Sequence, residues 1–86
     1  MSSKLIILNL PRDLTENELK TLFESYGEVI SCDLILDKNT GVSKGFGFII
    51  MELVSQADIA VKALHQTRLK KQKIRVKLAT QEQQIN

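Results

Sequence analysis

Apolar residues in this chain switch repeatedly between the two-residue spacing of a strand and the 3.6-residue spacing of a helix. Strand spacing predicts strands at residues 4–9, 29–36, 44–52 and 73–78. Helical spacing predicts one helix after Thr15 and a second that starts at Ser55. This βαββαβ order predicts an α+β fold, in which two helices cover one face of a four-stranded antiparallel sheet. The other face is left open and is the place to look for function.

The first predicted helix carries signals at both of its ends. Thr15 and Glu18 form a capping box, in which the Thr15 hydroxyl accepts from the third helical N–H and Glu18 reaches back. Gly27 is expected to end the helix in a left-handed conformation. The buried face of this helix is predicted to consist of Leu19, Leu22, Phe23 and Tyr26.

The second predicted helix has a Ser–Asp pattern, typical of a helix start, at residues 55–58. Small residues on its apolar stripe would let it lie close to the sheet. That stripe consists of Ala57, Ala60, Val61 and Leu64. Between the second and third strands, residues 37–41 form a turn cluster, which predicts a hairpin with a long mobile loop.

Composition limits the class of protein. Of the 86 residues, 43% are hydrophobic and 26% are charged, which indicates one globular domain and argues against disorder. We predict a folded core at residues 4–79 and a flexible polar tail at residues 80–86. No apolar run reaches the roughly 18–20 residues that cross a membrane, and the N-terminus does not resemble a signal peptide. We therefore expect an intracellular protein, cytoplasmic, or nuclear or organellar in a eukaryote. The single cysteine, Cys32, is expected to be a buried thiol.

The third strand carries two aromatic residues on one face. Side chains alternate across a strand, so Phe46, Phe48 and Ile50 point one way. Ile49 and Met51 point the other way and suit the core, and Gly47 would let a helix approach closely on that side. The opposite register would expose Ile49 and Met51 and bury Lys44, so we expect the aromatic residues on the open face.

The same alternation predicts which residues of the other strands join this face. In the second strand Cys32, Leu34 and Leu36 are expected in the core, and in the first strand Leu5 and Ile7. The predicted open face then consists of Ile6, Leu8, Asp33, Ile35, Phe46, Phe48, Ile50, Arg75 and Lys77.

Charge is distributed unevenly along the chain, although the net charge is only +2. Six of the ten residues at 68–77 are basic, whereas acidic residues dominate at 12–33. The basic segment is where a phosphate backbone would bind. Its other interpretation is a solvated, Lys-rich turn and strand edge.

Residues 44–51 are Lys-Gly-Phe-Gly-Phe-Ile-Ile-Met. They match the RNP1 signature, basic-Gly-aromatic-Gly-aromatic-aliphatic-x-aromatic, at seven of eight positions, and only Met51 departs from it. Residues 5–10 resemble the RNP2 hexamer. With these motifs the chain resembles the RNA recognition motif family over residues 4–79. Within that family it is similar to the short stand-alone members, which are bacterial and organellar RNA-binding proteins. The resemblance implies the ferredoxin-like fold and single-stranded RNA binding on the sheet, with no cofactor.

The resemblance also implies roles for individual residues. Phe46 and Phe48 would stack on bases, and the cations Lys44, Arg75 and Lys77 would meet phosphates or base edges. Ile6 stands where the family usually has an aromatic residue, so it would support a sugar or base edge without stacking. The basic residues 68–73 would steer the strand toward the sheet.

Two alternatives remain open. The aliphatic residues Ile6, Leu8, Ile35 and Ile50 also fit a protein-binding or self-associating surface, which predicts a protein partner or a weak homodimer. Single-stranded DNA is a possible ligand because stacking alone does not read the 2′-hydroxyl. An enzyme or metal site is not expected, since His65 is the only histidine. We expect His65 to interact with nearby carbonyls at the end of the second helix.

Overall fold

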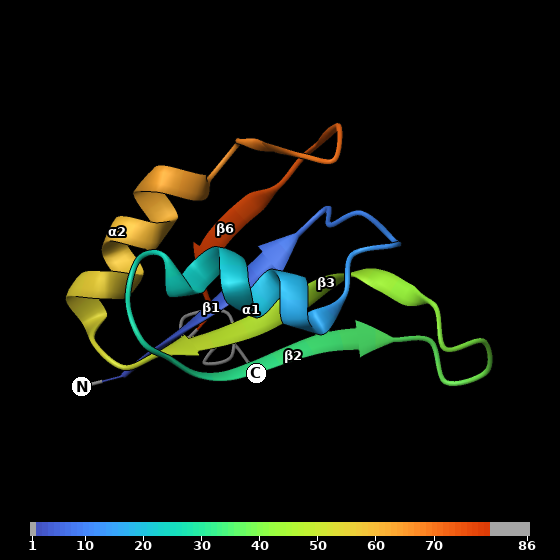
Figure 1. Ribbon diagram of the computed structural model, residues 1–86, viewed down its shortest axis with the longest axis horizontal. Coiled ribbons are helices and arrows are strands. Elements are labelled where there is room, and N and C mark those ends of the chain that lie inside the picture. The colour runs from blue at the N-terminus through green and yellow to red at the C-terminus, as the bar shows by residue number, and fades with distance from the viewer. Residues whose placement is uncertain (1, 80–86) are drawn as a thin grey trace.

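The computed structural model describes residues 2–79, in which four strands form one antiparallel sheet in the order β2-β3-β1-β6. Both helices lie against the same face of this sheet (Figure 1). The predicted α+β arrangement is therefore confirmed. The elements are β1 (Ser3–Leu8), α1 (Glu16–Glu24), β2 (Val29–Leu36), β3 (Ser43–Met51), α2 (Val54–Leu64), β4 (Arg68–Leu69), β5 (Gln72–Lys73) and β6 (Arg75–Leu78).

The two central strands, β1 and β3, alternate as predicted. Leu5 and Ile7 of β1 and Ile49 and Met51 of β3 are fully buried on the helix side. Gly47 lies on that side too, and a Cβ built on it would be 3.3 Å from Leu19 Cδ2 of α1 and 2.7 Å from the backbone oxygen of Asp33. The absence of a side chain at this position is thus what lets α1 pack directly on the sheet.

Helix α1 begins as the sequence predicts and ends earlier. Thr15 Oγ1 accepts from the N–H of Glu18 at 3.0 Å, and Glu18 Oε1 accepts from the N–H of Thr15 at 2.9 Å, which completes the capping box. The prediction for Gly27 is wrong. The helix ends at Glu24 with Ser25 as a right-handed cap, and Gly27 follows at φ 157°, a positive value that favours glycine but lies outside the left-handed helical region.

The predicted start of α2 is also wrong. The helix begins at Val54 with Leu53 as its N-cap, which supplies no side-chain hydrogen bond. Asp58 lies inside the helix, where it pairs with Lys62 at 3.1 Å. The predicted stripe of small residues does face the sheet: Ala57, Ala60 and Leu64 are buried, and Val61 is partly buried.

Two residues of β2 that were expected in the core are less buried than predicted. Leu36, which was expected in the core, is 49% exposed, because it is the last residue of β2 and lines an open groove beside the β2–β3 loop. Cys32 is only partly buried, and its Sγ donates to the backbone oxygen of Glu16 at 3.6 Å. Burial, followed by the nearby carboxylates Glu16 and Asp33, raises the pKa of the Cys32 thiol to about 11.

The last predicted strand is two separate pieces. Lys73 belongs to the small β4–β5 hairpin, and the sheet strand β6 starts only at Arg75. The hairpin turns through Lys70 and Lys71, both at positive φ. Leu78, at the end of β6, is 47% exposed. The predicted flexible tail at residues 80–86 lies outside the described residues. None of the helices within residues 2–79 is long and apolar enough to span a membrane.

Candidate nucleic-acid interface

The centre of the open sheet face is occupied by two aromatic rings. Phe46 and Phe48 are partly buried, and their ring centroids lie 6.1 Å apart with the ring planes at 85°. In the sheet register Phe46 pairs with Leu8, and Phe48 lies between Ile6 and Asp33. Strand pairing therefore fixes the position of both rings, while each ring keeps part of its surface accessible.

The remaining apolar residues predicted for this face lie on β3 itself and on its two neighbouring strands, β1 and β2. Ile6, Leu8, Ile35 and Ile50 are each partly buried. None of them is among the large hydrophobic side chains with the highest exposure in the described chain, which lie elsewhere, such as Ile30 at 55%. The apolar part of the face thus offers only part of its side-chain surface to a ligand.

Cations lie on both sides of the rings. Arg75 and Lys77 of β6 are exposed, opposite Leu8 and Ile6 respectively, and Lys44 is exposed near the start of β3. A further cation, Lys4, was not predicted: its Nζ lies 4.7 Å from the centroid of the Phe48 ring. Extending the alternation of β1 back from Ile6 would have placed Lys4 on this face.

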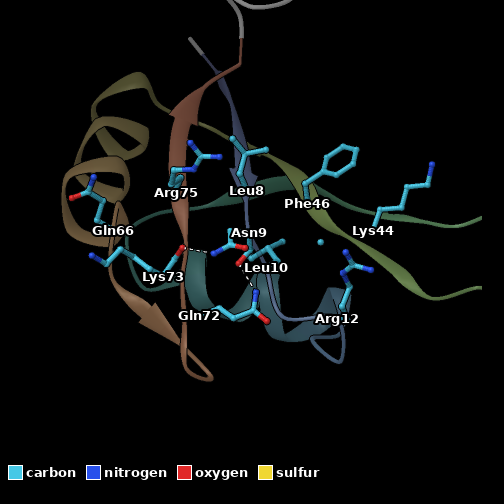
Figure 2. A pocket seen from close by; sticks show the side chains of 11 residues that line it. Leu8, Asn9, Leu10, Arg12, Lys44, Phe46, Gln66, Gln72, Lys73 and Arg75 are labelled. Carbon is cyan, nitrogen blue, oxygen red and sulfur yellow. Dashed lines mark hydrogen bonds between the residues drawn. The ribbon is translucent and has the colours of Figure 1, made fainter.

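A groove of about 830 Å³ continues from the sheet face past the end of β1 (Figure 2). Its lining includes Phe46, Arg12, Lys44 and Arg75. Asn9, at φ 62°, shapes one wall. Phe46, Lys44 and Arg75 were predicted for the site from the sequence. The loop residues Asn9 and Arg12 were not, because their position depends on contacts with residues distant in the sequence.

The small β4–β5 hairpin contributes Gln72 and Lys73 to the same groove and is bound to the end of β1 by hydrogen bonds with Asn9. Asn9 Nδ2 donates to the backbone oxygen of Lys73 at 2.9 Å, and Gln72 Nε2 donates to the backbone oxygen of Asn9 at 3.0 Å (Figure 2). These two bonds attach β5 to the end of β1 and hold Lys73 beside the open face.

The basic segment 68–73 does not act as one surface. Lys70 Nζ lies 3.4 Å from Glu18 Oε1 and 3.8 Å from Asp13 Oδ1, so this cation is directed to the acidic start of α1. Lys73, by contrast, lines the groove. Lys70 therefore contacts residues at the start of α1, whereas Lys73 lies beside the groove.

His65 takes part in a structural contact at the end of α2. Its Nδ1 accepts a hydrogen bond from the backbone N–H of Val76 at 3.1 Å. The predicted interaction with helix carbonyls is thus wrong, because the imidazole links α2 to the edge strand β6. Within residues 2–79 no group of three or more His, Cys, Asp or Glu side chains is arranged to hold a metal ion.

Comparisons with known proteins point to the same family as the sequence motifs do. The sequence matches the RNA recognition motif family over residues 5–75. It is 40% identical over 81 residues to glycine-rich RNA-binding protein 4, mitochondrial, of Arabidopsis thaliana. The matched residues make up 94% of this chain and 60% of that protein. The chain spans less than two thirds of the length of the curated relatives it matches.

Solved structures share the fold closely. The crystal structure of RNA-binding protein PG1 has a TM-score of 0.87 at 35% identity, over 90% of this chain and 93% of that one. The Sxl-lethal protein in a complex with RNA has a TM-score of 0.87 at 29% identity, over 92% of this chain and 47% of that one. With its RNP1 octapeptide on the open strand β3 and a family match that covers most of its length, this chain belongs to the RNA recognition motif family.

Proposed function

We propose that this protein binds single-stranded RNA on the open face of its sheet and catalyses no reaction. The observation that carries the proposal is the pair of partly exposed rings, Phe46 and Phe48, with cations on both sides. Single-stranded nucleic acid is bound by this combination, in which bases stack on aromatic rings and phosphates meet Lys or Arg. The RNA-binding relatives, and the neighbour that was solved with RNA, support the same ligand.

Each group of side chains has a role in this proposal. Phe46 and Phe48 each stack on one base, and the cations Lys44, Arg75 and Lys77 contact phosphates or base edges. Apolar contacts to sugars and base edges come from Ile6, Leu8, Ile35 and Ile50. Ile6 offers no flat ring, so this platform stacks two bases where an aromatic residue at that position would add a third.

Alanine substitution of the two rings tests the proposal. Loss of one stacked base costs about 1–3 kcal/mol, so Phe46→Ala and Phe48→Ala should each weaken binding about 5- to 150-fold. Affinity is measured by fluorescence anisotropy with a labelled RNA of randomised sequence, and folding is checked by circular dichroism. The matched control is Ile59→Ala, a truncation of an apolar side chain that is 54% exposed on α2. Unchanged affinity in folded ring variants would refute the stacking mechanism.

The same samples separate the alternative ligands. Titration with a DNA oligomer of matched sequence reports whether the 2′-hydroxyl contributes. Sedimentation of the RNA-free protein over a range of concentrations reports self-association. A stable dimer that Ile35→Lys dissociates, together with no RNA binding by the wild type, would favour a protein-binding face instead. We also propose residues 4–79 as the folded core that carries binding.

A further inference from the structure

The groove beyond the end of β1 concentrates cations that have no carboxylate partner. Arg12, Lys44, Lys73 and Arg75 all line it, and no acidic side chain does. In the described part of the chain, the ion pairs involve other cations, Lys20, Lys62 and Lys70. The groove therefore keeps its positive charge available to an external anion, while several cations elsewhere are neutralised by neighbouring carboxylates.

Local structure holds Arg12 at this position. The N–H of Leu10 donates to the backbone oxygen of Gly45 at 2.8 Å, which ties the loop after β1 to β3. Gly45 has φ +86°, and a Cβ built on it would be 3.3 Å from Arg12 Nε. The arginine side chain thus extends across the glycine toward the start of β3. Figure 2 shows Arg12 and Lys44 on one side of the groove and Arg75 on the other, with the Lys73 ammonium directed away from it.

The groove is continuous with the proposed stacking surface, because Leu8 and Phe46 belong to both. Its volume, about 830 Å³, falls within the roughly 300–1,000 Å³ range of sites that hold small ligands. It can therefore take one nucleotide of a strand whose neighbouring base stacks on Phe46. Arginine also suits this position, since its guanidinium can contact two phosphate oxygens at once.

We infer that this groove is a phosphate subsite, in which Arg12, with Lys44, binds the backbone of the nucleotide adjacent to the one on Phe46. The inference rests on the proposed function and extends it: the RNA footprint continues past the sheet, over the loop that follows β1. An RNA too short to reach the groove gains nothing from Arg12. A longer RNA gains one charge-assisted contact.

The test is a length series of oligouridylates, from three to eight nucleotides, titrated by NMR against the wild type, Arg12→Gln and Arg12→Lys. Wild-type affinity should rise once the strand reaches the groove. Arg12→Gln should lower the affinity for the longer oligomers about fivefold, the scale of one exposed charge contact. Its affinity for the shortest oligomer should equal that of the wild type. For Arg12→Gln, the slope of the logarithm of the binding constant against the logarithm of the salt concentration should be smaller by roughly 0.7. Arg12→Lys should retain only part of the rise, because it keeps the charge but loses the contact with two phosphate oxygens.

The control is Lys62→Gln on α2, which changes the net charge equally at a site away from the groove. An equal loss for all lengths, no loss at any length, or the same effect from Lys62→Gln would overturn the subsite. Phe46→Ala and Phe48→Ala on the shortest oligomer report on the stacking platform alone. Loss of that binding with an inert Arg12→Gln would therefore refute the subsite while leaving the proposed function intact.

Discussion

The ammonium of Lys4 lies over the ring of Phe48, 4.7 Å from its centroid, so that one of the two rings proposed to stack on RNA already carries a cation. Lys4 and Phe48 come from neighbouring strands, β1 and β3. An exposed cation–π pair stabilises by about 0.5–1 kcal/mol. A base that stacks on the same surface of the ring must displace this ammonium, which can then meet a phosphate.

Lys4→Met should lower the free energy of unfolding by about 0.5–1 kcal/mol, because it keeps the side-chain length and removes the cation. In NMR spectra of the free protein, the ring current of Phe48 should shift the Lys4 ε-methylene protons upfield. The shift should disappear in Phe48→Leu and decrease when RNA is added. Lys4 resonances that are identical in the wild type and Phe48→Leu would contradict the contact.

Gly47→Ala should destabilise the fold by about 1–3 kcal/mol, as overpacking does in a dense core. The added methyl group would lie 2.7 Å from the backbone oxygen of Asp33 and 3.3 Å from Leu19 Cδ2. Urea unfolding measures the loss, and the methyl shifts of Leu19 report where the strain falls. Gly41→Ala is the control, since no atom lies within 4 Å of its Cβ and its effect comes from backbone conformation alone. Unchanged stability and unchanged Leu19 methyl shifts in Gly47→Ala would contradict the close approach of α1.

The capping box predicts a pH dependence at the start of α1. The backbone N–H of Thr15, and then the nearby Lys70, lower the pKa of the Glu18 carboxyl below its ordinary value of 4.5. A carboxyl with a lowered pKa stabilises the fold fully above its unfolded value, and this contribution is lost as the pH falls through its folded value.

The stability difference between the wild type and Glu18→Gln should therefore be constant above about pH 5 and shrink below it. Urea unfolding at a series of pH values measures that difference, and an NMR titration of the carboxyl carbon gives the pKa directly. A Glu18 pKa at or above 4.5 would rule out this account.

Lys70 and Arg75 should differ in their effect on RNA binding, although both belong to the basic segment. Lys70 is paired with Glu18 and Asp13, whereas Arg75 lies on the open face. Arg75→Gln should reduce the log–log salt slope of binding by roughly 0.7, the value for one phosphate contact on a single strand. Lys70→Gln should leave the slope unchanged. Equal slopes for the two variants would mean that the hairpin cations act together.

The sequence predicted which face of β3 carries Phe46 and Phe48, because a two-residue period leaves only two registers. Burying Ile49 and Met51 forces Phe46 and Phe48 onto the opposite face, and the wrong register would expose the core. The same logic failed for the burial of Leu36. Leu36 lines the same groove as Leu34, next to Glu16 of α1, so it points to the predicted side. Alternation predicts a side chain's direction but not how far the core extends along the strand.

Parts of the site that depend on tertiary contacts could not be predicted. The β4–β5 turn places Lys70 and Lys71 at positive φ, where the usual sequence signal would be Gly or Asn. Arg12 is held by a loop whose anchor, Gly45, is far along the chain. The start of α2 at Val54 has no side-chain cap, so the nearby Ser and Asp misled the prediction.

The nearly perpendicular rings of Phe46 and Phe48 have a consequence for the shape of a bound strand. Bases in a duplex are parallel and spaced about 3.4 Å apart along the axis. Two bases lying flat on these rings would instead be turned almost at a right angle to each other, with centres farther apart. A helix cannot supply that geometry without unstacking, so the arrangement of two phenylalanines already selects for strands whose bases are free to rotate.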